Sequence, residues 1–245
     1  MMAAIIELRD VSFSAQDRKV LHEISIEFKE ATITAIVGPS GSGKSTVLKV
    51  SAGLLVPDNG EVLYKGNNVA LMNRGENLDF RREMAFVFQD SALWANQDLY
   101  QILELPLKIH YPQMTKYQRA QRIKEVAAEA GYRKDMNIRP SRLSMGEQKL
   151  IAFARAMLCN PSLLFLDEWV ESLDETSANR LIEIVKRKHK EGASVIFVCH
   201  DMRIIRDLAD SVVVIAEGRE VFEGTKEELL KSSELSDFLS MGIAS

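Results

Sequence analysis

Apolar and polar residues alternate along the first part of the chain, between residues 5 and 28. A period of two is typical of strands that bury one face, and the polar stretch at residues 16–19 predicts a turn between two such strands. We therefore expect the chain to begin with an antiparallel β-sheet.

Short apolar runs separated by helical segments follow this sheet and indicate an α/β core with mostly parallel strands. A Gly-rich turn joins the first run to a helix expected over residues 44–52 and ended by Gly53. The predicted strands are 32–37, 61–64, 84–88, 163–166, 194–199, 211–216 and 220–222, and a final helix begins at Lys226.

Strand-like runs are absent between Asp98 and Leu158, where residues 116–130 and 146–158 have the composition and spacing of helices. We therefore predict a helical lobe, about residues 91–158, inserted into a single domain that spans residues 1–245.

The composition, 46% hydrophobic and 27% charged over 245 residues, is that of an ordinary globular protein. A net charge of −4 disfavours a protein that binds the backbone of a nucleic acid. No apolar run approaches the roughly 20 residues of a membrane-spanning helix, and the N-terminus lacks the pattern of a secretory signal. We expect a cytoplasmic protein, with Cys159 and Cys199 as buried thiols.

A phosphate-binding pattern, G-x-x-x-x-G-K-[ST], lies between a predicted strand and a predicted helix. Glycines let backbone N–H groups approach a polyphosphate, and the helix N-terminus adds partial positive charge. Lys44 is expected to reach the β- and γ-phosphates, and Ser45 to offer its hydroxyl to Mg²⁺. The simpler alternative is a Gly-rich turn that only caps a helix, but such a turn would not need the complete pattern, so the complete pattern favours phosphate binding. The candidate nucleotide-binding residues here are Gly38, Pro39, Ser40, Gly41, Ser42, Gly43, Lys44, Ser45 and Thr46.

Two carboxylates, Asp167 and Glu168, end the apolar run at 163–166. At the carboxyl edge of a parallel sheet they would lie beside a bound nucleotide. We expect Asp167 to bind Mg²⁺ and Glu168 to orient and deprotonate the attacking water. Alone, the pair would be two solvated residues at the start of a loop, but the upstream phosphate-binding pattern favours the catalytic interpretation.

The segment Leu143–Gln148, with the sequence LSMGEQ, resembles the LSGGQ signature of ATP-binding cassette (ABC) proteins. Ser144 and the Gly146 N–H at the start of a helix would form a second anion site. The resemblance extends over nearly the whole chain. It implies a P-loop NTPase (RecA-like) fold, hydrolysis of ATP with Mg²⁺, and a dimer in which this site binds the phosphate of the ATP held by the other subunit.

Three further residues match the family in order. Gln89 resembles the glutamine that touches Mg²⁺ and the attacking water, and its alternative is a surface amide. His200 resembles the histidine that contacts the γ-phosphate, and its alternative is a helix-start residue. Asp174 resembles the aspartate at the dimer seam, although it also suits the N-cap of a helix from Glu175 onward.

The chain departs from the family pattern at three positions. Met145 replaces the first glycine of the signature, so it either limits approach to phosphate or packs against the helical lobe. Ala15 falls where an aromatic usually stacks on adenine, which leaves Phe13 or the partner subunit for that contact. Trp169 replaces a common proline and is either a core aromatic or a contact at the dimer seam.

Local features resemble the ATPases of Mla/MCE-type phospholipid transport systems: residues 88–94 around Gln89, Val170, and the tail at 238–243. This resemblance implies a membrane-spanning permease whose short helix docks near Gln89, Leu93 and Trp94, on the inner face of the cell membrane. Importers of amino acids and lipoprotein-releasing systems have similar neighbourhoods, and an importer of small polar solutes stays open as an alternative.

A soluble ABC ATPase acting on DNA, ribosomes or Fe–S assembly is the alternative from another class. DNA-repair relatives have a long coiled-coil insertion and translation relatives have two cassettes, so the single cassette and short helical lobe of this chain disfavour both. An Fe–S assembly ATPase stays open. A P-loop kinase or GTPase would lack the signature at residues 143–148.

Overall fold

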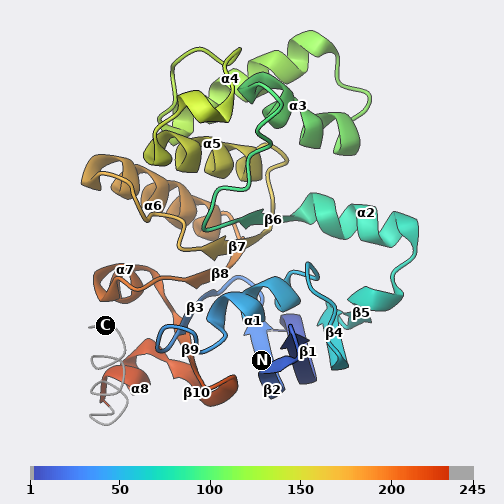
Figure 1. Ribbon diagram of the computed structural model, residues 1–245, viewed down its shortest axis with the longest axis vertical. Helices are drawn as coiled ribbons and strands as arrows, with labels where there is room; N and C mark the ends of the chain where they lie inside the picture. The colour runs from blue at the N-terminus through green and yellow to red at the C-terminus, as the bar shows by residue number, and fades with distance from the viewer. Residues whose placement is uncertain (1–2, 232–245) are drawn as a thin grey trace. The chain divides into compact units, whose positions relative to one another are not determined.

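The computed structural model describes residues 3–231 and divides the chain into two compact units (Figure 1). The first unit combines the chain up to residue 77 with the chain from residue 192 onward, and the second spans residues 78–191. The predicted tail feature at residues 238–243 lies outside the described residues. Within residues 3–231 no helix is long and apolar enough to cross a membrane.

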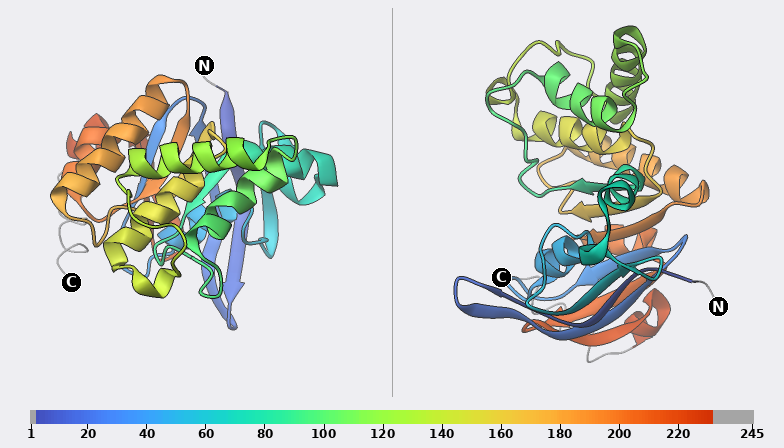
Figure 2. Two further views of the ribbon diagram at one scale, coloured as in Figure 1. Left: turned by 90° about the horizontal axis from the view of Figure 1, so that it is seen from above. Right: turned by 90° about the vertical axis from the view of Figure 1, so that its right-hand side faces the viewer.

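The first unit begins with the predicted antiparallel sheet, whose strand order is β2-β1-β4-β5. Its strands are β1 (Ala4–Ala15), β2 (Arg18–Lys29), β4 (Asn59–Tyr64) and β5 (Asn67–Asn68). Figure 2 shows β1 and β2 as a long, curved hairpin. Alternate residues in the second half of β2 are buried, namely Ile24, Ile26 and Phe28, which is the period-two pattern predicted from the sequence.

The first unit also contains parallel strands in the order β10-β9-β3-β8, with only β10 antiparallel to its neighbour. They are β3 (Ile33–Val37), β8 (Ser194–Val198), β9 (Ser211–Ala216) and β10 (Arg219–Thr225). Every residue of β3 and β8 is buried, because parallel strands are covered on both faces. The helices of this unit are α1 (Lys44–Ser51), the 3-10 helix η1 (Val69–Leu71), α7 (Met202–Leu208) and α8 (Lys226–Lys231).

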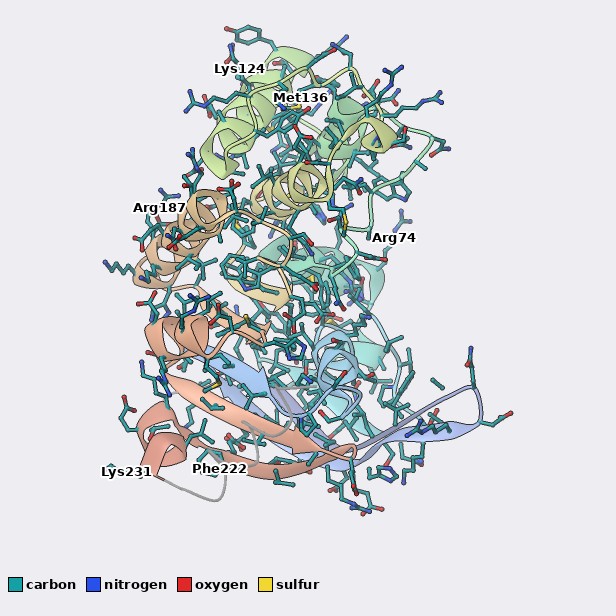
Figure 3. All side chains as sticks on the ribbon, turned by 60° about the vertical axis from the view of Figure 1, so that its left-hand side comes forward. Arg74, Lys124, Met136, Arg187, Phe222 and Lys231 are labelled. Carbon is teal, nitrogen blue, oxygen red and sulfur yellow. The ribbon has the colours of Figure 1, made fainter. Side chains whose placement is uncertain are left out.

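The second unit pairs two parallel strands, β6 (Met84–Val87) and β7 (Leu163–Asp167), with several helices. Helix α2 (Arg74–Glu83) leads into β6. The segment predicted as a helical lobe holds α3 (Leu99–His110), α4 (Lys116–Ala130), the 3-10 helix η2 (Pro140–Arg142) and α5 (Met145–Met157), and α6 (Glu175–Lys190) follows β7. Arg187 on α6, which is labelled in Figure 3, forms an ion pair with Glu129 on α4.

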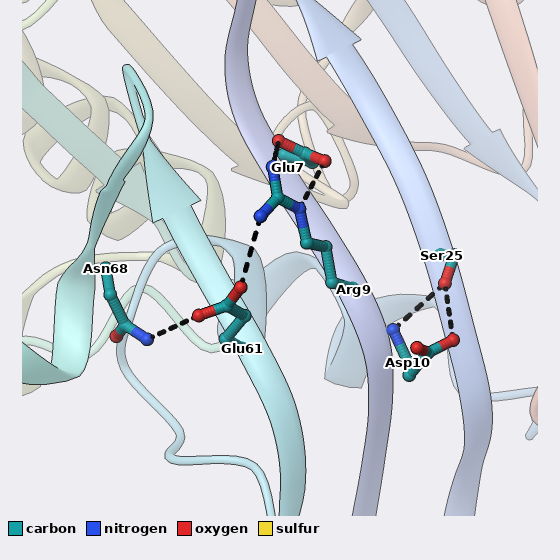
Figure 4. A network of polar contacts seen from close by, with 6 residues as sticks. All are labelled: Glu7, Arg9, Asp10, Ser25, Glu61 and Asn68. Atoms are coloured by element: carbon teal, nitrogen blue, oxygen red, sulfur yellow. Dashed lines mark hydrogen bonds and ion pairs between the residues drawn. The ribbon is translucent and has the colours of Figure 1, made fainter.

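A polar network crosses the exposed face of the N-terminal sheet (Figure 4). Arg9 on β1 binds Glu7 on its own strand at 2.6 Å and Glu61 on β4 at 3.2 Å. Glu61 also accepts a hydrogen bond of 2.9 Å from Asn68 on β5. The network joins three strands on a solvated face, where ion pairs contribute little to stability but help to fix the strand register.

Candidate nucleotide-binding and hydrolysis site

The candidate site residues are divided between the two units. The phosphate-binding pattern and His200 belong to the first unit. Gln89, the acidic pair, the signature and Asp174 belong to the second.

The predicted phosphate loop connects the buried strand β3 to helix α1. Gly38 has a φ of 147°, and a Cβ atom there would lie 2.0 Å from the carbonyl oxygen of Ile215. Gly43, with a φ of 102°, sits at the N-cap of α1 and supplies no side-chain cap. The glycines are therefore required by the tight path of the loop, and the first turn of α1 keeps N–H groups that its cap residue does not bind.

Polar groups of this loop suit a polyphosphate. The buried Lys44 side chain folds back, with Nζ donating to the carbonyl oxygens of Gly38 at 2.9 Å and Pro39 at 2.7 Å. The buried Ser42 hydroxyl has no hydrogen-bond partner among the described residues. A cation, an unpartnered hydroxyl and a helix N-terminus on one glycine loop fit the phosphates of a nucleotide.

The two carboxylates follow β7 as predicted, and both are buried: Asp167 is 1% exposed and Glu168 is 6% exposed. The alternative of two solvated residues at the start of a loop is therefore wrong. Glu168 has a φ of 43°, a left-handed conformation that non-glycine residues rarely adopt. Such strain is typical of sites where the surroundings hold a residue in a required geometry.

Gln89 follows β6 and is exposed, and its side-chain amide donates to the carboxylate of Glu171 at 3.2 Å. It is thus a surface amide with a defined partner on the loop after β7. In the first unit, His200 lies exposed after β8, one residue before Asp201, the N-cap of α7. His200 is therefore not the residue that caps this helix.

The signature segment forms the start of α5. The Ser144 hydroxyl caps the helix by accepting from the Glu147 N–H at 3.2 Å, and the Glu147 carboxylate accepts from the Ser144 N–H at 2.9 Å. A Cβ atom on Gly146 would lie 3.1 Å from the carbonyl oxygen of Ser172, so this glycine allows close packing against the loop after β7. The Met145 side chain is 71% exposed, which contradicts the interpretation that it packs against the helical lobe.

Two open alternatives can be compared with the structure. Asp174 caps α6 by accepting from the Ser177 N–H at 2.9 Å, and hydrogen bonds from this turn lower the pKa of its carboxyl. The N-cap role is confirmed, and the seam role stays a prediction. Trp169 is fully buried, with its ring stacked on Phe153 of α5 at a centroid distance of 5.8 Å, so it is a core aromatic.

Within the second unit, two residues that the sequence analysis did not single out connect the loops after β6 and β7. The buried ammonium of Lys149 on α5 donates to the main-chain oxygens of Gln89 and Glu168, the latter at 3.2 Å. Glu171 holds the Gln89 side chain. The one available signal for Lys149 is its position four residues before Phe153, which places it on the apolar face of a helix.

The loop after Gln89 presents the predicted docking residues. Trp94 is 45% exposed and Leu93 is half-buried. The Arg155 guanidinium lies 5.9 Å from the centre of the Trp94 ring and donates to the carbonyl oxygens of Ser91 and Ala92. This loop is therefore tied to α5 and still carries an exposed aromatic ring.

Comparison with known proteins agrees with these features. The ABC transporter family model matches residues 21–171. The MlaF ATP-binding protein of the intermembrane phospholipid transport system of Haemophilus influenzae is 31% identical over 232 residues, covering 94% of this chain and 88% of that protein. The methionine import ATP-binding protein MetN of Corynebacterium jeikeium is 30% identical, covering 93% of this chain and 62% of that protein.

A solved structure shows the same fold. The dimeric post-hydrolysis state of the ATP-binding cassette MJ0796, bound to ADP and Pi, aligns with a TM-score of 0.83 and 28% identity, covering 90% of this chain and 98% of that one. The predicted α/β P-loop NTPase fold is thus confirmed. With the family model matching more than half of its length, the chain belongs to the ABC transporter family, as an ATP-binding domain that hydrolyses ATP in support of transport.

Proposed function

We propose that the chain is the ATPase subunit of a membrane transporter and that it closes as a dimer around two ATP molecules. The observation that carries this proposal is the phosphate loop, in which Gly38, Ser42 and Lys44 suit a polyphosphate. The dimer is supported by the dimeric cassette MJ0796, which has the same fold. The membrane partner is supported by the transport systems to which its relatives belong.

Each part of the site has a proposed task. Lys44 and the N–H groups at the start of α1 would bind the phosphates. Ser45 in the first unit, and Asp167 and Gln89 in the second, would each offer an oxygen ligand to Mg²⁺, which would supply positive charge against the phosphoryl oxygens. Glu168 accepts a proton from the attacking water, and His200 donates a hydrogen bond to the transferring group. Ser144, Gly146 and Asp174 of one subunit complete the site of the other.

For the transported substrate we propose a phospholipid. The MlaF proteins of Haemophilus influenzae and Escherichia coli are 31% and 30% identical over at least 93% of this chain. The exposed Trp94 ring beside Leu93 suits the apolar side of a permease helix at the inner face of the membrane. The relative MetN supports a second candidate, import of a small polar solute such as an amino acid.

Two substitutions test the ATPase assignment in the complex purified from membranes with its bound subunits. Glu168→Gln is expected to retain ATP binding, to trap the dimer and to lower turnover at least about a hundredfold. Lys44→Ala is expected to lose ATP binding because it removes a charge beside the phosphates. The matched control is Glu183→Gln, at a carboxylate that is 70% exposed on α6. Near-normal hydrolysis by Glu168→Gln would refute the assigned role.

The substrate is tested with the same complex in lipid vesicles. A phospholipid transporter is expected to move a fluorescent phospholipid between membranes only when ATP is present, and the Glu168→Gln complex should abolish that movement. ATP-dependent uptake of radiolabelled methionine, without phospholipid movement, would favour the second candidate. Identification of the co-purified subunits provides an independent check, because a soluble partner alone would contradict both candidates.

A further inference from the structure

Lys149 is a buried cation that none of the recognised motifs explains. It lies in the second turn of α5, is 3% exposed, and directs its ammonium group to two main-chain carbonyl oxygens, those of Gln89 and Glu168. Burying an ammonium group is unfavourable unless polar groups replace its water. The carbonyl groups that replace this water belong to two residues to which we assign catalytic tasks.

These contacts close a ring of four residues. The Gln89 side-chain amide donates to the Glu171 carboxylate at 3.2 Å, and the Glu171 main-chain N–H donates to the Glu168 carbonyl oxygen at 3.2 Å. Lys149 completes the ring because it binds both Gln89 and Glu168. The loops that follow β6 and β7 are therefore held at a fixed distance by one side chain from a third element.

The same face of α5 also contacts Trp169, the residue that follows Glu168. Phe153 lies one turn after Lys149, and its ring stacks on fully buried Trp169, which directly follows Glu168. Glu168 itself has a left-handed backbone with a φ of 43°, which its surroundings must maintain. A polar contact to the Glu168 carbonyl and an aromatic contact to the next residue together fix this conformation.

Charges around Lys149 also favour its position. Burial lowers the pKa of the Lys149 ammonium, whereas the carboxylates of Glu171, Asp167, Glu168 and Asp90 act in the opposite direction. The cation thus lies among four acidic side chains, and loss of its charge would leave their mutual repulsion less offset.

We propose that Lys149 is a positioning residue for hydrolysis, which sets the main chain of Gln89 and Glu168 so that their side chains reach the nucleotide and the water. This inference rests on the proposed function of those two residues. Lys149 contacts their carbonyl groups and has no proposed contact with ATP, so its loss affects the chemical step more than nucleotide binding.

The test uses Lys149→Met, which keeps an unbranched side chain one atom shorter and removes the ammonium. In the intact complex we expect kcat to fall at least about tenfold while the Kd for ATP changes by less than about twofold. Combined with Glu168→Gln, the same change should have a smaller further effect on kcat, because the Glu168 carboxylate that Lys149 places is absent and only the effect through Gln89 remains.

Two controls separate positioning from stability. Arg119→Met removes a cation of α4 that pairs with Glu104 at 2.9 Å and contacts neither loop, so it measures the effect of a structural loss in the same unit. Lys124→Met removes an exposed lysine from α4 (Figure 3). Neither is expected to change kcat beyond about twofold. If Lys149→Met does not fold, Lys149→Gln keeps an N–H donor and should give a smaller fall in kcat with the same unchanged Kd.

The possible results are distinct. A normal kcat for Lys149→Met or Lys149→Gln, a fall no larger than that of Arg119→Met, or full additivity with Glu168→Gln would overturn the inference. Failure of the proposed function is seen separately, as rapid hydrolysis by Glu168→Gln alone, whatever Lys149 does.

Discussion

Substitution of Trp169 tests how the residues after β7 are held in place. Trp169 is fully buried and stacks on Phe153, with 23° between the ring planes. Its indole Nε1 is buried and has no hydrogen-bond partner among the described residues. The same side chain therefore stabilises the fold through its packing and destabilises it through its N–H group.

The two contributions predict different effects for two substitutions. Trp169→Ala removes the whole ring and is expected to lower the free energy of unfolding by about 3–5 kcal/mol. Trp169→Phe loses about 1 kcal/mol of apolar burial, but it also removes a desolvated donor that costs about 1–3 kcal/mol when unpaired. We therefore expect Trp169→Phe to lie within about 1 kcal/mol of the natural protein.

Urea unfolding followed by circular dichroism measures both effects without relying on tryptophan fluorescence. The control is Trp94→Phe at the other of the two tryptophans. Because Trp94 is 45% exposed, this substitution should change the urea midpoint little. A Trp169→Phe protein as unstable as Trp169→Ala would refute the reasoning, because it would show that the indole N–H has a stabilising partner.

Two further predictions concern α5 and the ion pairs of the helical segment. In the Glu168→Gln protein with ATP, Met145→Gly is expected to strengthen the dimer. Met145 is 71% exposed at the first residue of α5, where its side chain would limit how closely the signature approaches the partner's phosphate. An unchanged monomer–dimer constant in analytical ultracentrifugation would exclude this steric explanation. Burial raises the pKa of Glu104, but ion pairs with Lys108 at 2.6 Å and Arg119 at 2.9 Å outweigh it and hold the pKa below its ordinary value. Glu104→Gln should therefore cost about 1–2 kcal/mol at neutral pH. Urea titrations at several pH values measure the difference in free energy of unfolding between the natural protein and Glu104→Gln. This difference should shrink as the pH falls from the ordinary carboxyl pKa through the lower pKa of Glu104 in the folded protein, and a pH-independent difference would contradict the prediction.

The strands were predictable because burial on both faces leaves a clear apolar run, as in β3 and β8. Helix α2 was not predicted, because Phe80 is its only buried residue and its sequence has no apolar period. Strand β10 extends over Arg219–Thr225, beyond the predicted 220–222, because none of its residues is fully buried and backbone pairing with β9 defines its length. Pairing with β9, which a local pattern does not record, determined the bounds of β10.

The motifs of the site were recognisable because phosphate binding needs fixed residue types at fixed spacing. Lys149 follows no such rule. A lysine in a helix is usually solvated, and only the packing of α5 shows that this one faces two loops instead of water. The burial of Asp167 and Glu168 likewise depends on neighbours that are distant in sequence.

Helix α5 connects the signature segment to the loop that carries Glu168 within one subunit. Its first turn holds Ser144 and Gly146, the proposed contacts to the partner's ATP, and its second turn holds Lys149. Lys149 lies five positions after Ser144, a rise of about 7.5 Å along a helix whose backbone hydrogen bonds resist compression. A shift of the helix start therefore moves the Lys149 ammonium by a similar amount, and with it the Glu168 and Gln89 carbonyl groups. If the proposed dimer closes on Ser144, we therefore expect this rigid connection to couple closure to hydrolysis.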